Sequence, residues 1–330
     1  MGEITHPPAP KGATSPTDRL AQILLTGGPV PFLAPLLVSL LAVEPPPATE
    51  LVFLHSLASS SGVLPMSGVS LAFEPSHQEL YVSGNGLVRV FNQAGMQVFE
   101  FGEDPAVGGI LAAVPLENGD LIALSFLEGK LGLLRVNFRG EPLGRVALEV
   151  PETLTGFIPT VLRQHDGKLY LADSGMMQVL VVEPSGAFVD TYDLGALLQV
   201  GNERGDHGLR GFNVDFAGNL LVTIQPLFAA YVISPERTVR TFGTRGSTPG
   251  KFNVVGGITR DALGNFYVAD ILRSVVMVFG PDFKFVREFG YRGSGRGNLA
   301  GPDELALGDG RLFVANNARR GVSVFKVEHR

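Results

Sequence analysis

Three short acceptor side chains recur at the same place in a repeated sequence pattern. Asp173 ends the run LYLAD, Asp270 ends FYVAD and Asn316 ends LFVAN. Such side chains, if they converged from several strands, could form a ring of ligands for a metal or a polar substrate. A single Asp or Asn at a strand end also bonds nearby backbone N–H groups and fixes a loop without any ligand. We favour this structural role, and the other repeats hold Ser83, Ser125 and Thr223 at the same position.

Few other residues suggest catalysis. The chain has no cysteine, which excludes disulfides, thiolate catalysis and a cysteine-ligated metal. Of the six histidines only His207 occupies a long predicted loop beside acidic residues, and a lone histidine does not make a zinc site. The sequence contains no G-x-S-x-G elbow, P-loop or H-E-x-x-H motif. The sequence therefore identifies no catalytic residue.

The acceptor positions belong to a repeat whose clearest copy covers residues 242–279. Short runs rich in Val, Phe and Tyr alternate with turns such as Gly264-Asn265, which predicts a small antiparallel sheet. The position of Tyr267 recurs in every copy of the repeat. In chain order its residues are Tyr81, Ile122, Tyr170, Leu221, Tyr267 and Phe313. The spacings between them are 41, 48, 51, 46 and 46 residues. One four-stranded blade per repeat predicts an all-β, six-bladed β-propeller of antiparallel blades. Its inner strands are expected to begin near residues 68, 109, 159, 211, 256 and 303.

The unit FG…G…G-F…GI-x-x-D-x-x-G-N-x-Y-V-A-D resembles the NHL repeat over residues 68–326. The resemblance implies a six-bladed propeller of the bacterial, exported type. The copy around Leu121 departs most from the pattern, because it lacks both the aspartate after its second strand and the preceding FG signature. Residues 51–57 (LVFLHSL) are typical of an outer strand, and the last repeat ends without one. We expect this N-terminal strand to complete the last blade and close the ring, which removes exposed sheet edges.

Related six-bladed propellers include lactonase-like hydrolases, strictosidine-synthase-like proteins and peptide-amidating lyases, and some hold a metal in the central channel. The resemblance makes Asn213, Asp303 and Glu304 the candidate ligands at the channel entrance. These oxygen donors could hold Ca²⁺. The other blades offer only Ser70, Ala112 and Leu162 there, so we expect no cofactor. A calcium-dependent lactonase or lyase is the alternative function.

Basic residues concentrate on one predicted face of the propeller. Loops that join one blade to the next share this face with loops that join second and third strands. These loops carry Arg204, Arg210, Arg245, Lys251, Arg273, Arg292, Arg296, Arg319 and Arg320. The first two repeats place acidic residues there instead: Glu103, Asp104, Glu128 and Glu152. Such a divided field can orient an anionic partner, and arginine makes two-point contacts with carboxylates; a solvated rim is the alternative.

The N-terminal region differs in composition from the repeats. Residues 1–19 form a polar, proline-rich leader, and residues 20–43 contain no charge. The segment PFLAPLLVSLLAV within them has the length of a signal-peptide core; a membrane anchor and an apolar extension packed on the propeller are the other interpretations. No basic residue lies between Arg19 and Arg89, which places the propeller outside the membrane by the positive-inside rule. We expect a periplasmic or extracellular protein, with residues 44–50 as a linker and residues 51–330 as the propeller.

Together these patterns predict a non-catalytic binding scaffold or accessory subunit that uses the arginine-rich face. The expected partner is another protein or protein complex, membrane-associated if residues 20–43 tether the chain. A net charge of −6 fits poorly with nucleic-acid binding. A small-molecule substrate is the less favoured partner.

Overall fold

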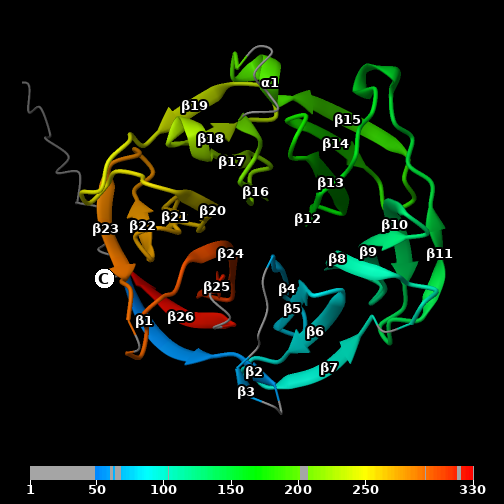
Figure 1. The fold of residues 1–330 in the computed structure, drawn as a ribbon, viewed down its shortest axis with the longest axis horizontal. Helices are drawn as coiled ribbons and strands as arrows, with labels where there is room; N and C mark the ends of the chain where they lie inside the picture. Colours follow the sequence, from blue (N-terminus) through cyan, green and yellow to red (C-terminus); the bar gives the residue numbers. More distant parts are fainter. Residues whose placement is uncertain are drawn as a thin grey trace, which may run out of the picture. The chain divides into compact units, whose positions relative to one another are not determined.

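The computed structural model describes residues 49–59, 62–63, 68–102, 104–200, 207–293, 295–317 and 321–329. Its strands form six four-stranded antiparallel sheets, arranged as blades around a central axis (Figure 1). The all-β, six-bladed propeller predicted from the repeat spacing is therefore confirmed. The leader, the apolar stretch 20–43 and most of the predicted linker lie outside the described residues.

Each blade runs from an inner strand at the axis to an outer strand at the rim. Blade 1 consists of β4 (Ser70–Glu74), β5 (Glu79–Gly84), β6 (Leu87–Phe91) and β7 (Gln97–Phe101). Blade 2 consists of β8 (Gly109–Pro115), β9 (Leu121–Leu127), β10 (Lys130–Val136) and β11 (Pro142–Val146). Blade 3 consists of β12 (Val161–His165), β13 (Lys168–Asp173), β14 (Gln178–Val182) and β15 (Phe188–Asp193). The repeat around Leu121, which departs most from the pattern, thus also forms a complete blade.

The second half of the ring has the same construction. Blade 4 consists of β16 (Gly211–Val214), β17 (Leu220–Ile224), β18 (Ala229–Ile233) and β19 (Val239–Phe242). Blade 5 consists of β20 (Val255–Arg260), β21 (Phe266–Asp270), β22 (Val275–Phe279) and β23 (Phe285–Gly290). Blade 6 contains β24 (Pro302–Gly308), β25 (Arg311–Asn316) and β26 (Val322–His329). A hairpin of β2 (Ala58–Ser59) and β3 (Gly62–Val63) and a short helix, α1 (Leu194–Leu197), lie outside the blades.

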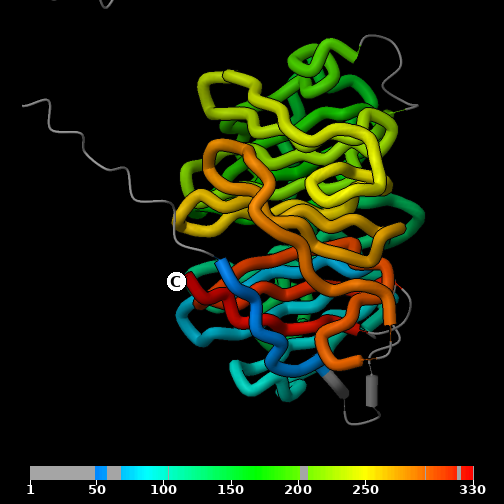
Figure 2. Tube along the Cα trace, turned by 90° about the vertical axis from the view of Figure 1, so that its left-hand side faces the viewer, coloured from blue at the N-terminus to red at the C-terminus, as the bar shows by residue number. Residues whose placement is uncertain are grey.

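The fourth strand of the last sheet comes from the other end of the described chain. Strand β1 (Thr49–Ser56) pairs antiparallel with β26, with Leu51 opposite Val327 and Phe53 opposite Phe325. Figure 2 shows these two strands side by side, blue against red. The Phe53 and Phe325 rings meet edge to face with their centroids 5.6 Å apart.

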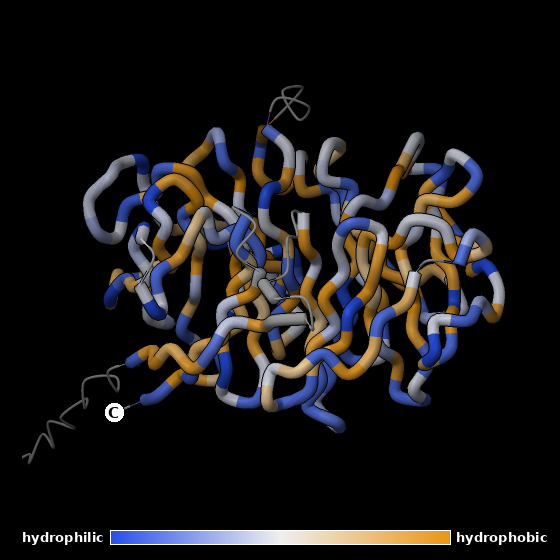
Figure 3. The backbone as a smooth tube through the Cα atoms, turned by 60° about the horizontal axis from the view of Figure 1, so that its bottom comes forward, coloured by the Kyte–Doolittle hydropathy of each residue, from blue (hydrophilic) through white to orange (hydrophobic). Residues whose placement is uncertain are grey.

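The core lies between neighbouring blades rather than inside any one of them. Every residue of β14, β17, β21 and β22 is buried, because side chains that alternate across these strands pack on a blade at either side. One cluster joins blades 6 and 1 through Phe313 and Phe91, and another joins blades 4 and 5 through Phe242 and Phe266. Apolar residues fill the strands, whereas the connections at both ends are largely polar (Figure 3).

The acceptor positions fix the loops, as the sequence predicts. Asp270 is completely buried and accepts hydrogen bonds from the backbone N–H groups of Asn253, Val254 and Arg273 at 2.7, 3.4 and 3.0 Å. Three N–H groups of two loops are thus satisfied by one carboxylate. At the equivalent place in blade 4, Thr223 donates to the backbone oxygen of Gly256 at 2.6 Å.

Asp173 and Asn316 act in the same way on their own loops. Asp173 accepts hydrogen bonds from the backbone N–H groups of Ile158 and Met176, both at 2.9 Å. Asn316 accepts one from Ala300, also at 2.9 Å. The loop-fixing role predicted for these positions is confirmed, because each side chain is committed to local backbone groups.

We expect Phe53→Ala to lower the free energy of unfolding by about 2 kcal/mol, because it removes a half-buried ring that packs on Phe325. Leu54→Ala is the matched control, because Leu54 is exposed on the same strand and should cost less than about 0.5 kcal/mol. Urea denaturation of the three proteins measures both effects. Equal costs for the two substitutions would show that β1 does not contribute through this contact.

Asp270→Ala should cost about 2 to 4 kcal/mol, because it leaves three buried or half-buried N–H groups without an acceptor. Ser83→Ala changes the equivalent position in blade 1, where the buried hydroxyl has no hydrogen-bond partner among the described residues. This control should be neutral within about 0.5 kcal/mol. A small effect of Asp270→Ala in thermal and urea unfolding would show that these loops keep their conformation without the Asp270 carboxylate.

Candidate functional site

The propeller has two faces that carry different kinds of connection. We use "loop face" for the side with the connections between blades and between second and third strands, including residues 104–108, 147–160, 243–254 and 295–301. The opposite "turn face" carries the short turns between first and second and between third and fourth strands, such as residues 75–78 and 261–265. We use "central channel" for the region around the axis that the six inner strands surround (Figure 1).

One arginine crosses the channel. Arg163, in β12, is 8% exposed, and its Nε donates to the backbone oxygen of Phe212 at 3.1 Å. Its Nη1 donates to Ser70 Oγ at 3.1 Å and to the backbone oxygen of Leu162 at 2.9 Å. Its Nη2 forms an ion pair with the Glu304 carboxylate. These partners belong to the inner strands of blades 1, 3, 4 and 6, so this side chain links four blades.

The position of Glu304 in the channel shifts the pKa of its carboxyl group. Burial and, to a smaller extent, the neighbouring Asp303 carboxylate raise the pKa of its carboxyl, which is about 7 in place of the ordinary 4.5. The Arg163 and Arg210 guanidinium groups oppose this rise in pKa without cancelling it. The channel therefore contains a carboxyl group that titrates near neutral pH.

The remaining predicted metal ligands also have partners. Asp303 accepts hydrogen bonds from Arg210 Nη2 at 2.5 Å and from Asn317 Nδ2 at 2.8 Å. Asn213 Nδ2 donates to the backbone oxygen of Ile258 at 3.3 Å. Asn213 lines a cavity on the turn side of Arg163, which neither Asp303 nor Glu304 lines.

The three predicted ligands are thus not brought together as one set of oxygen donors. Within the described part of the chain no group of three or more His, Asp or Glu side chains is placed to hold a metal ion. Asp303 and Glu304 each face a guanidinium group. Calcium binding at the channel entrance would require Arg163 and Arg210 to move away from these carboxylates.

Arg163 was not among the site residues expected from the sequence. The available signal was a charged residue in the middle of an inner strand (TVLRQ), a position that faces the channel or a neighbouring blade. A buried arginine requires an acidic partner. That partner, Glu304, follows 141 residues later, and the two become neighbours only because distant blades meet around the axis.

The predicted basic residues of the loop face fall into two groups. Arg210 and Arg273 have carboxylate partners: Arg210 pairs with Asp303, and Arg273 Nη2 contacts the two Glu288 oxygens at 2.6 and 2.8 Å. Four others are exposed and form no ion pair within the described residues: Arg245, Lys251, Arg292 and Arg296. Arg204, Arg319 and Arg320 lie outside the residues that the structure describes.

Arg245 and Arg292 occupy equivalent places in two similar loops. Each forms an isolated parallel bridge across its loop, Arg245 with Phe252 and Arg292 with Leu299. Phe252 and Leu299 are completely buried and anchor the loops in the core. The backbone of both arginines is therefore held in a defined position while the side chains remain exposed.

Large apolar side chains are exposed beside these cations. Leu272 is 63% exposed and Tyr291 is 55% exposed, both in loop-face connections of blade 5 and its junction with blade 6. Ile158 and Met176 of blade 3 are exposed on the same face. The turn face also exposes apolar side chains: Met96, Phe138, Phe216 and Leu263. The turn face also has an exposed arginine without an ion pair, Arg139 beside Phe138, whereas the loop face carries four such cations on two neighbouring inter-blade loops.

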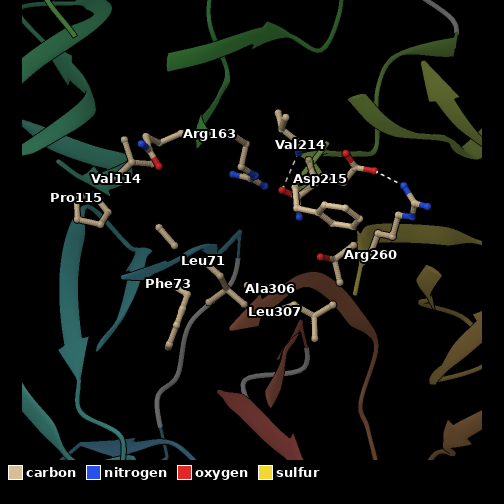
Figure 4. A pocket seen from close by; sticks show the side chains of 15 residues that line it. Leu71, Phe73, Val114, Pro115, Arg163, Val214, Asp215, Arg260, Ala306 and Leu307 are labelled. Atoms are coloured by element: carbon tan, nitrogen blue, oxygen red, sulfur yellow. Dashed lines mark hydrogen bonds and ion pairs between the residues drawn. The ribbon is translucent and has the colours of Figure 1, made fainter. Parts of the chain in front are cut away.

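A cavity of about 260 Å³ opens at the turn end of the channel (Figure 4). All six inner strands contribute to its lining. Arg163 closes it toward the channel interior, and Arg260 lies in its wall, paired with Asp215 at 2.8 Å. Sequence reasoning gave no indication of this cavity, because its lining residues are spread over the whole repeat region.

Titration of Glu304 should make stability depend on pH. Its folded-state pKa of about 7 exceeds the ordinary value of 4.5, so the folded protein binds more protons between these values and loses stability as pH rises through this window. Glu304→Gln cannot titrate. Its stability relative to wild type should therefore rise by on the order of 3 kcal/mol from pH 4.5 to pH 8 in urea denaturation.

Glu128→Gln is the control for that comparison, because it removes an exposed carboxylate that pairs with Arg145 at the surface. If Glu304→Gln and wild type lose stability in parallel over this pH range, Glu304 does not titrate in it.

No helix among the described residues is long and apolar enough to cross a membrane. The chain matches no protein-family model, and no curated protein matches it in sequence.

Solved structures match the fold over most of the chain. A streptogramin B lyase is 12% identical with a TM-score of 0.53 and covers 85% of this chain and 98% of its own. A luciferin-regenerating enzyme is 11% identical with a TM-score of 0.56 and covers 85% of this chain and 95% of its own. A protein of unknown function from Bacteroides thetaiotaomicron is 14% identical with a TM-score of 0.60 and covers 85% and 76%. At these identities the likeness establishes the β-propeller fold that this chain shares with propeller enzymes and with proteins of unknown function.

Proposed function

We propose that this protein is a non-catalytic binding scaffold or accessory subunit that takes an acidic protein partner on the loop face of its last three blades. The observation that carries the proposal is the group of exposed cations without carboxylate partners: Arg245, Lys251, Arg292 and Arg296. An arginine already paired with a carboxylate must lose that contact before it binds another. These four side chains can bind an acidic surface without breaking an existing ion pair.

The surroundings of these cations support protein binding over a purely solvated rim. Arg245 lies over the Phe228 ring, with its guanidinium carbon 4.9 Å from the ring centroid. Leu272 and Tyr291 add exposed apolar area on neighbouring connections. Protein interfaces are enriched in arginine, aromatic residues and methionine and depleted in lysine and glutamate. The bridges that hold Arg245 and Arg292 also reduce the entropy lost when a partner orders these loops.

The repeat type and the cellular location of the chain are part of the same proposal. We propose that the repeats are of the NHL type and that residues 20–43 export the chain or tether it to a membrane. The propeller would then meet its partner in the periplasm or outside the cell. In this proposal β1 closes the ring, so the binding face is carried by a scaffold without free sheet edges.

Reversing two of the free cations should abolish partner binding. We expect tagged full-length wild-type protein to recover a stoichiometric partner from its native cells in mild detergent, and Arg245→Glu with Arg292→Glu to lose it. Both residues are exposed, so the free energy of unfolding should stay within about 1 kcal/mol of wild type. Quantitative mass spectrometry of the recovered complexes and urea denaturation measure the two effects.

Arg139→Glu with Lys284→Glu is the charge-matched control, because both residues are exposed in turns of the turn face. This variant carries the same change in net charge and should retain the partner. Loss of the partner in both variants would indicate a non-specific charge effect. Recovery of the wild-type chain without a stoichiometric partner, or retention by the loop-face variant, would contradict the proposal.

A further inference from the structure

The loop face carries exposed carboxylates as well as exposed cations. We use "junction" for a loop-face connection between two consecutive blades and number it by those blades. Asp104 in junction 1–2 and Glu152 in junction 2–3 are exposed and form no ion pair with any described residue. Residues 102–108 and 147–160 contain no Lys or Arg. These two neighbouring junctions form an acidic sector of the loop face.

The junctions on the other side of the propeller form a matching basic sector. Junctions 4–5 and 5–6 carry the four exposed cations, in chain order Arg245, Lys251, Arg292 and Arg296. Residues 243–254 and 291–301 contain no Asp or Glu. Around the axis, one junction separates the two sectors on each side: junction 3–4 and junction 6–1 (Figure 1).

Opposite charges occupy the same place in similar loops. Asp104, Arg245 and Arg292 each stand two residues after the glycine of a Phe-Gly pair at the end of an outer strand. A completely buried apolar residue later in each loop anchors it, in chain order Val107, Phe252 and Leu299. Since the repeats are equivalent, these charges lie at similar distances from the propeller axis. The acidic and basic sectors can therefore meet when two loop faces are stacked.

We propose that the acidic partner of the loop face is a second copy of this chain, an inference that rests on the function proposed above. In two propellers stacked loop face to loop face, the blades run in opposite senses around the shared axis. When the two-fold axis passes over junctions 3–4 and 6–1, junction 1–2 of one copy lies over junction 5–6 of the other, and junction 2–3 lies over junction 4–5. Asp104 then faces Arg292, and Glu152 faces Arg245. Two-fold symmetry makes each of these contacts twice.

The order of charges selects this one orientation of the two copies about the axis. Turning one copy by one blade leaves only one acidic junction over a basic one. Turning it by two or three blades places acidic junctions over acidic ones and basic junctions over basic ones. Like charges that face each other across an interface are strongly unfavourable.

Exposed apolar side chains meet in the same orientation. The connection between the second and third strands of blade 5 then lies over that of blade 2. Leu272, 63% exposed in blade 5, faces Phe126, which is 52% exposed at the end of β9. Phe126 and Leu111 line a shallow hollow of about 240 Å³ on the loop face of blades 1 and 2. Apolar contacts are thus surrounded by charged ones, as is usual in protein interfaces.

A second copy explains more of the loop face than an unrelated acidic protein does. An unrelated protein bound to the basic sector leaves the carboxylates of Asp104 and Glu152 and the apolar side chains of Leu111 and Phe126 without a role. A second copy uses both sectors and both apolar groups at once.

Paired charge reversals test the inference on the full-length protein in mild detergent. We expect wild type to sediment as a dimer. Asp104→Arg with Glu152→Arg, and separately Arg245→Glu with Arg292→Glu, should each weaken self-association by at least about tenfold, because like charges then face each other. An equimolar mixture of the two variants should form a mixed dimer with an affinity within about threefold of wild type, because every reversed residue again faces an opposite charge. Sedimentation velocity measures the association, and native mass spectrometry identifies the mixed dimer.

Glu117→Arg with Glu183→Arg is the charge-matched control for the acidic sector, because both residues are exposed in turns of the turn face. It should dimerise like wild type. Asp104 also accepts a hydrogen bond from the backbone N–H of Ala106 at 2.8 Å, so melting curves are needed to establish that its variants fold. Asp104→Asn with Glu152→Gln keeps a side-chain oxygen at both positions. This variant should weaken self-association by about threefold through loss of charge alone.

A monomeric wild type, undiminished dimerisation of either charge-reversal variant, or a mixture that stays monomeric would overturn the inference. The function proposed above has a separate outcome. If wild type is monomeric and recovers a different acidic protein from its native cells, and Asp104→Arg with Glu152→Arg still recovers that protein, the basic sector binds a partner other than a second copy. If wild type recovers neither a second copy nor another protein, both proposals are wrong.

Discussion

Each blade must bury two apolar faces, and the rest of the structure depends on this constraint. All residues of the middle strands β21 and β22 are buried, which is achieved only when a blade packs on both of its neighbours. An open arc of blades would expose one apolar face at either end. In the described chain blade 6 packs on blade 1, and β1 pairs with β26. The six inner strands are then forced to face one another across a narrow channel.

Polar side chains that enter the channel need hydrogen-bond partners there. Arg163 is a cation with little access to water, and its burial is unfavourable unless its N–H groups are satisfied. Backbone oxygens, Ser70 and Glu304 provide those contacts from four blades. The same contacts divide the channel: Asp303 and Arg210 lie toward the loop face, whereas the cavity with Arg260 lies toward the turn face. The two ends of the channel therefore present different side chains.

The sequence predicts the parts of this structure that depend on local patterns. Alternating apolar runs and Gly-Asn turns locate the blades, and Asp270 at a strand end predicts its bonds to nearby backbone groups. The repeat pattern also predicts which loops carry Arg245 and Arg292. It does not predict that Arg273 forms an ion pair with Glu288 while Arg292 forms none with a described residue. Such pairing depends on how the loops fold over a neighbouring strand. The Arg163–Glu304 pair and the cavity depend on contacts between distant blades, which no local pattern encodes.

Under the proposed function, pairing decides which arginines are able to bind a partner. Arg210 and Arg273 contribute to the formal charge of the loop face as much as Arg245 and Arg292 do, but their carboxylate partners already neutralise them. A new acidic partner would compete with these short contacts and gain little net energy. Arg245 and Arg292 have no carboxylate partner to lose when they bind an acidic surface, so their contribution should weaken with added salt, as expected for exposed charges. The specificity proposed for the loop face then depends on the spacing of the unpaired cations and the apolar residues around them.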